Sequence, residues 1–492
     1  MQNDQTPEAS IPPIVSASAN GPANDVSGKT PLAWRLAIAT ALAALFGLAY
    51  LARDAIGLRG QSVAGILFFF GIVAMFSANL RQVNWRTIGW GIAIQLILAL
   101  LVLQANVKIG NTNLSVYDGI RKASENIVTP FINCANQGAK FVFGNLADFP
   151  SMSSTFGKDF LIPFAFIALP PILFVSAFFT VLYHFGILQM CVRGMARIMI
   201  HLMRTSGAET LSVAANVFMG QTEAPLIIKP YVPRMTNSEL FVLMASGMAH
   251  ISGSMMVVYI SYGANPVAVI ATCIMACPCS LYLSKLFMPE VSRPETSGKL
   301  HADGMKSPYV NAIDAAASGT SDGLQLALNV AAMLIVFIAF VALFNILLGA
   351  VPTDWFRWTG ATLPDHFSLE WIFGRLFSPV AFLMGVDSRD QSNVGTLLGT
   401  KLAMNEHVAF LTMKSWKATP DFMSPRSYQL AAYALTGFAN FASVGIQLGG
   451  IGGLAPNRRH DLARLGMRAL FVGFVATLLN AAVAGAMSDL TQ

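Results

Sequence analysis

The sequence predicts an all-α polytopic membrane protein with about nine transmembrane helices and two re-entrant helical hairpins arranged as inverted repeats. Hydrophobic residues make up 54% of the 492-residue chain, and only 11% of its residues are charged. Soluble domains carry about 25% charged residues, so this balance is typical of a chain that lies mostly in lipid. The net charge of +6 requires no nucleic-acid partner, because membrane proteins gather Lys and Arg in their cytoplasmic loops.

The apolar segments define the spans. Residues 1–30 are rich in Pro, Ser, Asn and Ala and hold no long apolar run, which predicts a disordered tail. They do not resemble a signal peptide, since no basic segment leads directly into a hydrophobic one. A spanning helix needs about 20 apolar residues. This criterion predicts spans at 33–52, 62–79, 86–106, 160–184, 238–260, 264–287, 322–350, 427–449 and 466–487.

Loop charges predict a cytoplasmic N-terminus. In that orientation the inside loops hold more Lys and Arg than the outside loops, although Arg53, Arg59, Arg121 and Lys122 reduce the contrast. The inside set is Arg81, Arg86, Arg193, Arg197, Arg204, Arg293, Lys299, Lys306, Arg458, Arg459, Arg464 and Arg468.

Two further apolar segments are interrupted by polar residues and do not fit as spans. Residues 207–232 contain MGQTEAPLIIKP, and residues 376–414 contain GTKLAMNEHVAF. Each arm of the first segment has roughly a dozen residues and, at about 1.5 Å per residue, crosses only about half of the hydrocarbon. We predict two re-entrant hairpins, whose non-helical tips are tolerated only against protein or a water-filled cavity.

The span after each hairpin has small and polar residues at its middle. These stretches are SGMAHISGSMM at 246–256 and TGFANFASVGIQLGG at 436–450, where a helix can unwind and offer free carbonyls. The order hairpin, interrupted helix, helix thus occurs twice, and the loop charges place the two hairpin bases on opposite sides. Inverted repeats of this kind indicate a secondary transporter with a midplane site. Glu223 and Glu406, in matching positions, favour a binding role over helix capping.

Several of these motifs, in this order, resemble the concentrative nucleoside transporter family. GQTEAP, GTKLAMNEHVAF and GFANFAS resemble its three substrate-site motifs, and NAIDAAASG (311–319) and LAPNRRHDLARLG (454–466) resemble other recurrent stretches. The likeness covers nearly everything after about residue 62, so the span at 33–52 is an addition to the minimal bacterial form. Residues 387–391, DSRDQ, replace a turn that usually contains Pro-Trp in the family.

The resemblance implies the architecture and the substrate. It implies a homotrimer in the bilayer of the bacterial inner membrane (the plasma membrane), which imports nucleosides such as uridine and adenosine by alternating access, driven by a cation gradient. The implied substrate contacts are Gln221, Thr222 and Glu223 at the base, Met255 and Phe438 beside it, and Glu406, Asn440 and Ser443 at the ribose. The expected organisation is a tail at 1–30, N-terminal spans with amphipathic segments at 31–206, a first transport repeat at 207–287, a cytoplasmic linker at 288–320, a scaffold span at 321–350, an outside loop at 351–371 and a second transport repeat at 372–492.

The residue types agree with such a substrate. Ionised carboxylates accept strong hydrogen bonds from ribose hydroxyls, and an Asn or Gln amide offers both a donor and an acceptor to a base edge. No cluster of Lys and Arg accompanies the motifs to hold a phosphate. Lys401, within the second hairpin, is expected to pair with a carboxylate or a helix C-terminus.

The coupling ion stays open between sodium and the proton. In the family, sodium lies between the first hairpin tip and the following broken helix, and Asn216, Met219 and Ile251 match its ligand positions. His250 stands where the family has a small hydroxyl residue. An imidazole is a poor ligand for a hard cation but titrates near neutral pH. We hypothesise proton-driven uptake through His250; the alternative is a neutral His250 bonded to a hairpin carbonyl while sodium binds through the other oxygens.

Other classes of protein are less well supported by the sequence. An enzyme would need a nucleophile with a base, or a metal set, and NEHVAF supplies neither, so no catalytic residue or cofactor is expected. A selective channel is the alternative function, since re-entrant hairpins also build selectivity filters. Cys273, Cys277 and Cys279 lie in one apolar span and are predicted to be packing residues, with Pro278 kinking the helix.

Overall fold

The computed structural model describes residues 29–104, 106–109, 112–148, 151, 166, 169–298, 307–351 and 367–487. The tail up to residue 28, most of the loop at 351–371, and Lys299 and Lys306 lie outside the described residues. The helices are α1 (Leu32–Leu51), α2 (Arg53–Met75), α3 (Trp85–Leu103), α4 (Val116–Phe143), α7 (Pro170–His184), α8 (Ile187–Met203), α9 (Gly207–Ala215), α10 (Ala224–Ile227), α11 (Asn237–Ala249), α12 (Gly253–Ser261), α13 (Pro266–Phe287), α14 (Ala312–Gly349), α15 (Leu369–Leu383), α16 (Gln391–Ala403), α17 (Glu406–Lys417), α18 (Pro425–Leu435), α19 (Phe441–Leu454) and α20 (Arg459–Met487).

The predicted helical membrane fold is confirmed. Within the described ranges, six helical segments are long and apolar enough to span a membrane, or seven if α7 and α8, which meet at 71°, count as one span. The predicted spans at 322–350 and 427–449 correspond to α14 and to the shorter pair α18 and α19. The chain between α3 and α4 forms one antiparallel strand pair, β1 (Asn106–Ile109) and β2 (Thr112–Ser115), which was not predicted.

Helix α8 of the N-terminal region is amphipathic. The buried residues of α8 recur every three or four positions, so one face packs against the protein and Arg193 and Arg197 lie on the exposed face. A search for continuous apolar runs does not detect such a helix, because basic residues interrupt its sequence. The buried residues of this face are Leu188, Gln189, Val192, Ala196, Met199 and Met203.

Both hairpins are present as pairs of short helices. The first consists of α9 and α10, joined by the irregular residues 216–223, and α9 begins at a capping box in which Ser206 and Glu209 bond each other's backbone. The second consists of α16 and α17, joined at Met404 and Asn405. This hairpin is shorter than the predicted 376–414, because residues up to Leu383 belong to α15, which folds back along α16.

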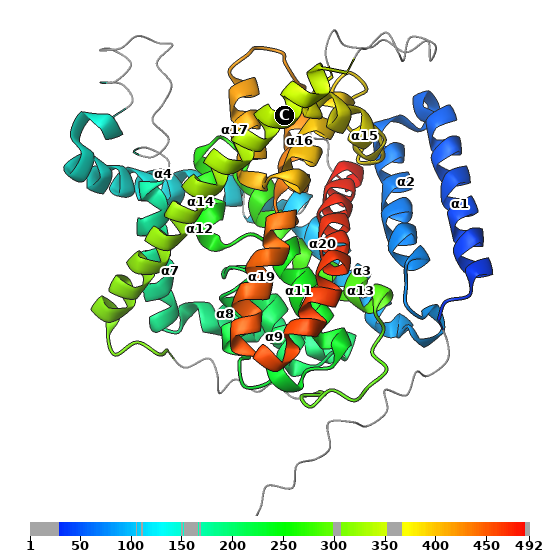
Figure 1. Cartoon of the computed structure of the whole chain (residues 1–492), viewed down its shortest axis with the longest axis horizontal. Coiled ribbons are helices and arrows are strands. Elements are labelled where there is room, and N and C mark those ends of the chain that lie inside the picture. The colour runs from blue at the N-terminus through cyan, green and yellow to red at the C-terminus, as the bar shows by residue number, and fades with distance from the viewer. Residues whose placement is uncertain are drawn as a thin grey trace, which may run out of the picture.

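Both spans that follow the hairpins are broken, as predicted. α11 gives way to α12 at residues 250–252, and α18 gives way to α19 at residues 436–440. Ser252 and Asn440 cap the restarting helices by accepting from the N–H groups of Met255 and Ser443. α11, α13 and α20 occupy the centre of the molecule, whereas α1 and α2 lie side by side at one edge (Figure 1).

The two helix breaks contact each other. The backbone N–H of Phe438 donates to the carbonyl of His250 at 3.0 Å, which joins one break to the other. Gly437 makes this approach possible, since a Cβ there would lie 2.6 Å from Cγ2 of Thr477 and 3.0 Å from the carbonyl oxygen of Ala249. The unwound backbone groups of both repeats therefore meet in the protein interior, where they are shielded from lipid.

Candidate functional site

Glu406 is the first residue of α17, the second of the two helices in the second hairpin. It is 4% exposed and follows Asn405, whose side chain caps α17 by accepting from the N–H of Val408 at 2.9 Å. Its Oε1 accepts from the Tyr259 hydroxyl at 2.8 Å, and its Oε2 accepts from Nδ2 of Asn440 at 2.9 Å. The helix N-terminus and these two donors favour the ionised carboxylate, although no cation among the described residues forms an ion pair with it.

Gln221 continues the polar site from the first hairpin. Its Nε2 donates to Oγ of Ser443 at 3.1 Å, and its Oε1 accepts from Nε2 of Gln447 at 3.1 Å. Gln447 also donates to the carbonyl of Met244 at 3.0 Å, which fixes its amide against α11. The base-side amide predicted from the sequence is therefore held at the start of α19.

These side chains form one continuous network between the two hairpin tips. Asn440 links the two halves, because its Oδ1 accepts from the N–H of Ser443 at 2.9 Å while its Nδ2 donates to Glu406. The network thus runs from Gln221 through Ser443, Asn440 and Glu406 to Tyr259. Together with Gln447, it concentrates a carboxylate, three amides and two hydroxyls, the groups needed to bind a neutral ligand rich in hydroxyls and amide-like edges. The structure brings together four of the residues predicted as substrate contacts.

Tyr259 and Gln447 belong to this network and were not predicted. Tyr259 is fully buried in α12, and its ring stacks on Phe410 of α17 with the centroids 4.4 Å apart. A tyrosine in an apolar span and a glutamine in a glycine-rich helix carry no local signal of function. Their partners are set by packing between segments more than a hundred residues apart.

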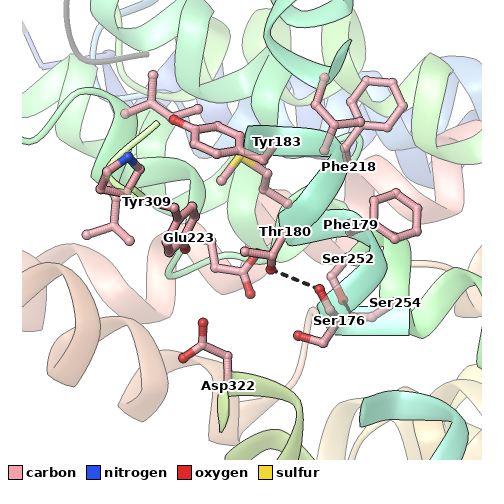
Figure 2. A pocket seen from close by; sticks show the side chains of 15 residues that line it. Ser176, Phe179, Thr180, Tyr183, Phe218, Glu223, Ser252, Ser254, Tyr309 and Asp322 are labelled. Atoms are coloured by element: carbon pink, nitrogen blue, oxygen red, sulfur yellow. Dashed lines mark hydrogen bonds between the residues drawn. The ribbon is translucent and has the colours of Figure 1, made fainter. Parts of the chain in front are cut away.

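Glu223 and Thr222 lie apart from the network. Oε2 of Glu223 accepts from the N–H of Gly220 at 3.1 Å within its own turn. The side chain points into a cavity of about 340 Å³, which Asp322 of α14 faces from the other side (Figure 2). Thr222 packs against Gly450 of α19, where a Cβ would lie 2.6 Å from Cγ2 of the threonine.

The cavity is lined by hydroxyl, aromatic and acidic side chains. Ser176, Thr180 and Tyr183 line it from α7, Ser252 lines it from the break between α11 and α12, and Ser254 lines it from the first turn of α12. No Lys, Arg or His is among the described residues that line it. Its volume is within the range of small-molecule sites, and it separates the first hairpin from α7 and α14.

Met255 and Phe438 flank the helix breaks. Met255 is 2% exposed in the first turn of α12, and Phe438 is half-buried in the break before α19. Both are apolar groups near the polar network, although no contact of either with Gln221 or Glu406 is among those described. Their predicted contact with a base stays a prediction.

The predicted cation position has one buried oxygen without a protein partner. Nδ2 of Asn216 donates to Oγ of Ser246 at 3.1 Å, whereas its Oδ1 is buried and unbonded in the described part of the chain. Met219 is half-buried and Ile251 fully buried, on the irregular segments that follow α9 and α11. Hard cations take oxygen ligands such as this amide oxygen and free backbone carbonyls, so the donor set is suited to sodium.

His250 hydrogen-bonds the backbone of its own helix. Its Nδ1 lies 2.8 Å from the carbonyl of Ser246, and a carbonyl only accepts, so Nδ1 carries a hydrogen. Its Nε2 lies 3.4 Å from Sγ of Cys277. The ring therefore bonds the carbonyl of its own helix and not a hairpin carbonyl, and Cys277 packs against it from α13.

Lys401 is fully buried and bonds a helix C-terminus, one of its two expected partners. Its Nζ donates to the carbonyl of Ala434 at 2.7 Å, in the last turn of α18, and to Oγ1 of Thr477 at 2.9 Å. Nζ also lies 5.4 Å from the ring centroid of Phe474. The ammonium group thus joins the second hairpin to α18 and α20.

Two re-entrant hairpins and two broken helices around a buried polar network define a membrane transport protein. Family models match the chain along most of its length: Na+ dependent nucleoside transporter N-terminus at 64–146, nucleoside recognition at 165–266, and Na+ dependent nucleoside transporter C-terminus at 268–485. The chain belongs to the Na+-dependent, or concentrative, nucleoside transporter family, as the sequence motifs indicated.

Relatives and solved structures agree with this assignment. A transporter of Haemophilus influenzae is 39% identical over 429 residues, covering 86% of this chain and 97% of the relative. Human sodium/nucleoside cotransporter 1 is 36% identical over 464 residues, covering 90% and 67%. CNTnw in an inward-facing substrate-bound state gives a TM-score of 0.77 at 35% identity, covering 87% and 97%.

The same fold is also known in a second conformation. An outward-facing state of a CNTnw variant gives a TM-score of 0.78 at 34% identity, covering 88% of this chain and 99% of that one. Inward- and outward-facing states of one fold support alternating access, and they do not support the channel alternative.

Proposed function

We propose that the protein imports nucleosides such as uridine and adenosine by secondary active transport, coupled to a cation gradient. The observation that carries this proposal is the buried carboxylate of Glu406, held between Tyr259 and Asn440 at the junction of both repeats. A ribose offers vicinal hydroxyls that can replace these donors at the carboxylate. Family membership and the names of relatives, which include a sodium/nucleoside cotransporter, support the same substrate class.

The base is proposed to bind at Gln221, with Thr222, Glu223, Met255 and Phe438 around it. In the network, both atoms of the Gln221 amide have protein partners, Ser443 and Gln447. A base edge that offers one donor and one acceptor can exchange for these bonds without leaving a buried amide unpaired. The cavity at Glu223 is proposed as the access route, since it reaches the first hairpin from the side of α7 and α14.

The assembly and orientation follow the resemblance. We propose a homotrimer in the bacterial inner membrane, with the N-terminus cytoplasmic and with α14 as part of the scaffold. Many large apolar side chains of α14, including Ile335, Ile346 and Leu347, are exposed on the single chain. An apolar helix exposed in this way requires lipid or another subunit against it.

Sodium is proposed as the coupling ion. The unbonded Oδ1 of Asn216 supplies a buried oxygen ligand, and the irregular backbone at Met219 and Ile251 can supply carbonyls. His250 then acts as a neutral residue that bonds the carbonyl of Ser246. The second candidate is proton coupling through His250, which stands where the resemblance implies a hydroxyl residue and bonds Ser246, the same residue that Asn216 bonds.

Uptake into proteoliposomes tests both the substrate and the ion. Sodium and pH gradients are imposed separately while uridine and adenosine uptake is measured, and saturable accumulation against the gradient is expected. Sodium coupling requires sodium-dependent uptake that Asn216→Ala abolishes. Proton coupling requires uptake that rises at acidic outside pH without sodium, and a shift towards sodium dependence in His250→Ser. Uptake that never exceeds equilibrium would refute secondary active transport.

A further inference from the structure

A cleft lined by basic side chains lies outside the site described above. It has a volume of about 640 Å³ and is bounded by the start of α3, the last turns of α8 and the segment at Ser297 and Gly298. No carboxylate is among the described residues that line it. Its charged and titratable members are Arg86, Arg197, His201 and Arg204.

Two carboxylates in a neighbouring cavity form ion pairs with a lysine and not with the arginines of the cleft. A neighbouring cavity shares Arg204 with the cleft and contains Glu209 and Glu290. Oε2 of each glutamate pairs with Nζ of Lys285, at 2.8 and 3.2 Å respectively. No ion pair to Arg86, Arg197 or Arg204 is present among the described residues. Three guanidinium groups therefore share one cleft without an ion-pair partner in the part of the chain that the structure describes, which raises the affinity of the cleft for an anion.

The cleft lies at the level of a membrane surface. Trp85 and Trp90, at the start of α3, are 59% and 40% exposed on either side of Arg86. Tryptophan rings exposed at the end of a spanning helix are typical of the membrane–water interface. On the amphipathic helix α8, Ile198 is 57% exposed next to Arg197, as in helices that lie in the interface plane.

We propose that this cleft binds the phosphate group of an anionic phospholipid. Guanidinium groups bind phosphate oxygens through paired, charge-assisted hydrogen bonds, and basic pockets between membrane helices accept such headgroups. In the predicted orientation the cleft faces the cytoplasmic leaflet, where anionic lipids supply the ligand.

The bound headgroup would lie beside the base of the first hairpin. Ser297, which lines the cleft, forms a bridge with Ser206, the residue that caps α9. The N–H groups of Gly207 and Ala208 donate to the carbonyl and the Oγ1 of Thr296, at 2.9 and 3.0 Å. The lipid therefore stabilises the segment that anchors the hairpin, independently of which nucleoside or cation is transported.

The test measures lipid binding on the purified full-length protein. Tail-labelled fluorescent phosphatidylglycerol is titrated against the protein in detergent, with phosphatidylcholine of the same chain length as the neutral comparison. Arg197→Gln and Arg204→Gln are each expected to weaken phosphatidylglycerol binding by about five- to tenfold. Arg193→Gln is the matched control, because Arg193 is exposed on the same helix, outside the cleft, and its Nε bonds the carbonyl of Gln189.

The pattern of lipid binding across the three variants tests whether the cleft is the binding site. Selective binding of phosphatidylglycerol that is weakened at Arg197 and Arg204, but about equally strong in the Arg193 variant and the unmodified protein, supports it. Equally weakened binding in all three variants would mean that the lipid is attracted by surface charge in general and not by the cleft, and would overturn the proposal. Displacement of the lipid by inorganic phosphate at equal concentration would overturn the proposal, because the cleft would then bind a soluble phosphate and not a lipid headgroup. Melting temperatures in phosphatidylcholine, measured alongside, separate loss of binding from loss of folding.

Discussion

Replacing Glu406 by Gln removes one negative charge and leaves the shape of the site almost unchanged. A glutamine can still accept from Asn440 through Oε1, and its amide can donate to the oxygen of Tyr259, so both bonds of the folded protein have replacements. The melting temperature should therefore stay close to that of the unmodified protein. What is lost is a carboxylate that accepts from ribose hydroxyls at a position only 4% exposed.

The size of the effect follows from the strength of that bond. Removing a hydrogen bond to a charged group costs about 1.5–3 kcal/mol, which corresponds to an affinity about ten- to a hundredfold lower. Uridine and adenosine share the ribose, so Glu406→Gln should weaken both by a similar factor. Binding of both nucleosides to purified protein, measured by calorimetry, provides the assay, and uptake into proteoliposomes provides a second readout.

A matched control separates the position from the charge. Glu370 lies on α15, is exposed, and accepts from Nδ2 of Asn345 at 3.0 Å. Glu370→Gln makes the same chemical change far from the network and should leave both affinities unaltered. Unchanged uridine binding in a folded Glu406→Gln protein, or a loss for only one nucleoside, would refute the assignment of Glu406 to the ribose.

Three further substitutions probe the base site, the helix breaks and the buried lysine. Gln221→Met should change the ratio of uridine to adenosine affinity by about two- to tenfold, and an equal loss for both would place this amide in a structural role. Gly437→Ala should lower both the melting temperature and uptake, because its Cβ would lie 2.6 Å from an atom of α20, whereas Gly445→Ala has open space and should change neither. Lys401→Met should lower the stability by about 1.5–3 kcal/mol, measured by thermal unfolding, while Lys417→Met at an exposed position serves as the control; equal effects would contradict the buried role.

The sequence was most informative where polar residues interrupt apolar runs. Glu406 and Asn440 each stand at the start of a short helix after a break, and the structure bonds them to each other. Lipid tolerates such interruptions only where protein or water satisfies the freed groups, so their presence in a sequence indicates where a site is to be expected. The sequence did not predict the bounds of the amphipathic helix α8. This helix has one apolar face and one basic face, and it contains no long apolar run.

The sequence was least informative about which way side chains point in irregular segments. Gln221 and Glu223 are two positions apart in one turn, yet Gln221 joins the network and Glu223 faces the cavity beside Asp322. Helical or strand periodicity fixes such directions, and a tip that is neither helix nor strand lacks that guide. Tyr259 was missed for a different reason, since its hydroxyl is satisfied by a partner 147 residues away.

The DSRDQ segment at 387–391, which replaces the usual turn of the family, bonds to the start of α18. Oδ2 of Asp390 accepts from the backbone N–H of Ser424 at 2.9 Å, and Asp387 accepts from the hydroxyl of the same serine. Ser424 caps α18, the first half of the second broken helix. The two aspartates therefore fix the turn before α16 to the start of α18, so they anchor the second hairpin beside the helix that it must accompany.

The proposed ion and substrate sites are connected through the first hairpin tip. Asn216 precedes Gln221 by five residues on the same irregular segment, and the carbonyl of Phe218, between them, accepts from the N–H of Gly253 at 3.0 Å. A cation held by Oδ1 of Asn216 would order this segment and so reduce the entropy lost when a nucleoside binds at Gln221. Linkage makes this effect reciprocal: the factor by which the cation raises nucleoside affinity equals the factor by which the nucleoside raises cation affinity. Under the proposed function, the short connection between the two sites would couple them without any direct contact between the ion and the substrate.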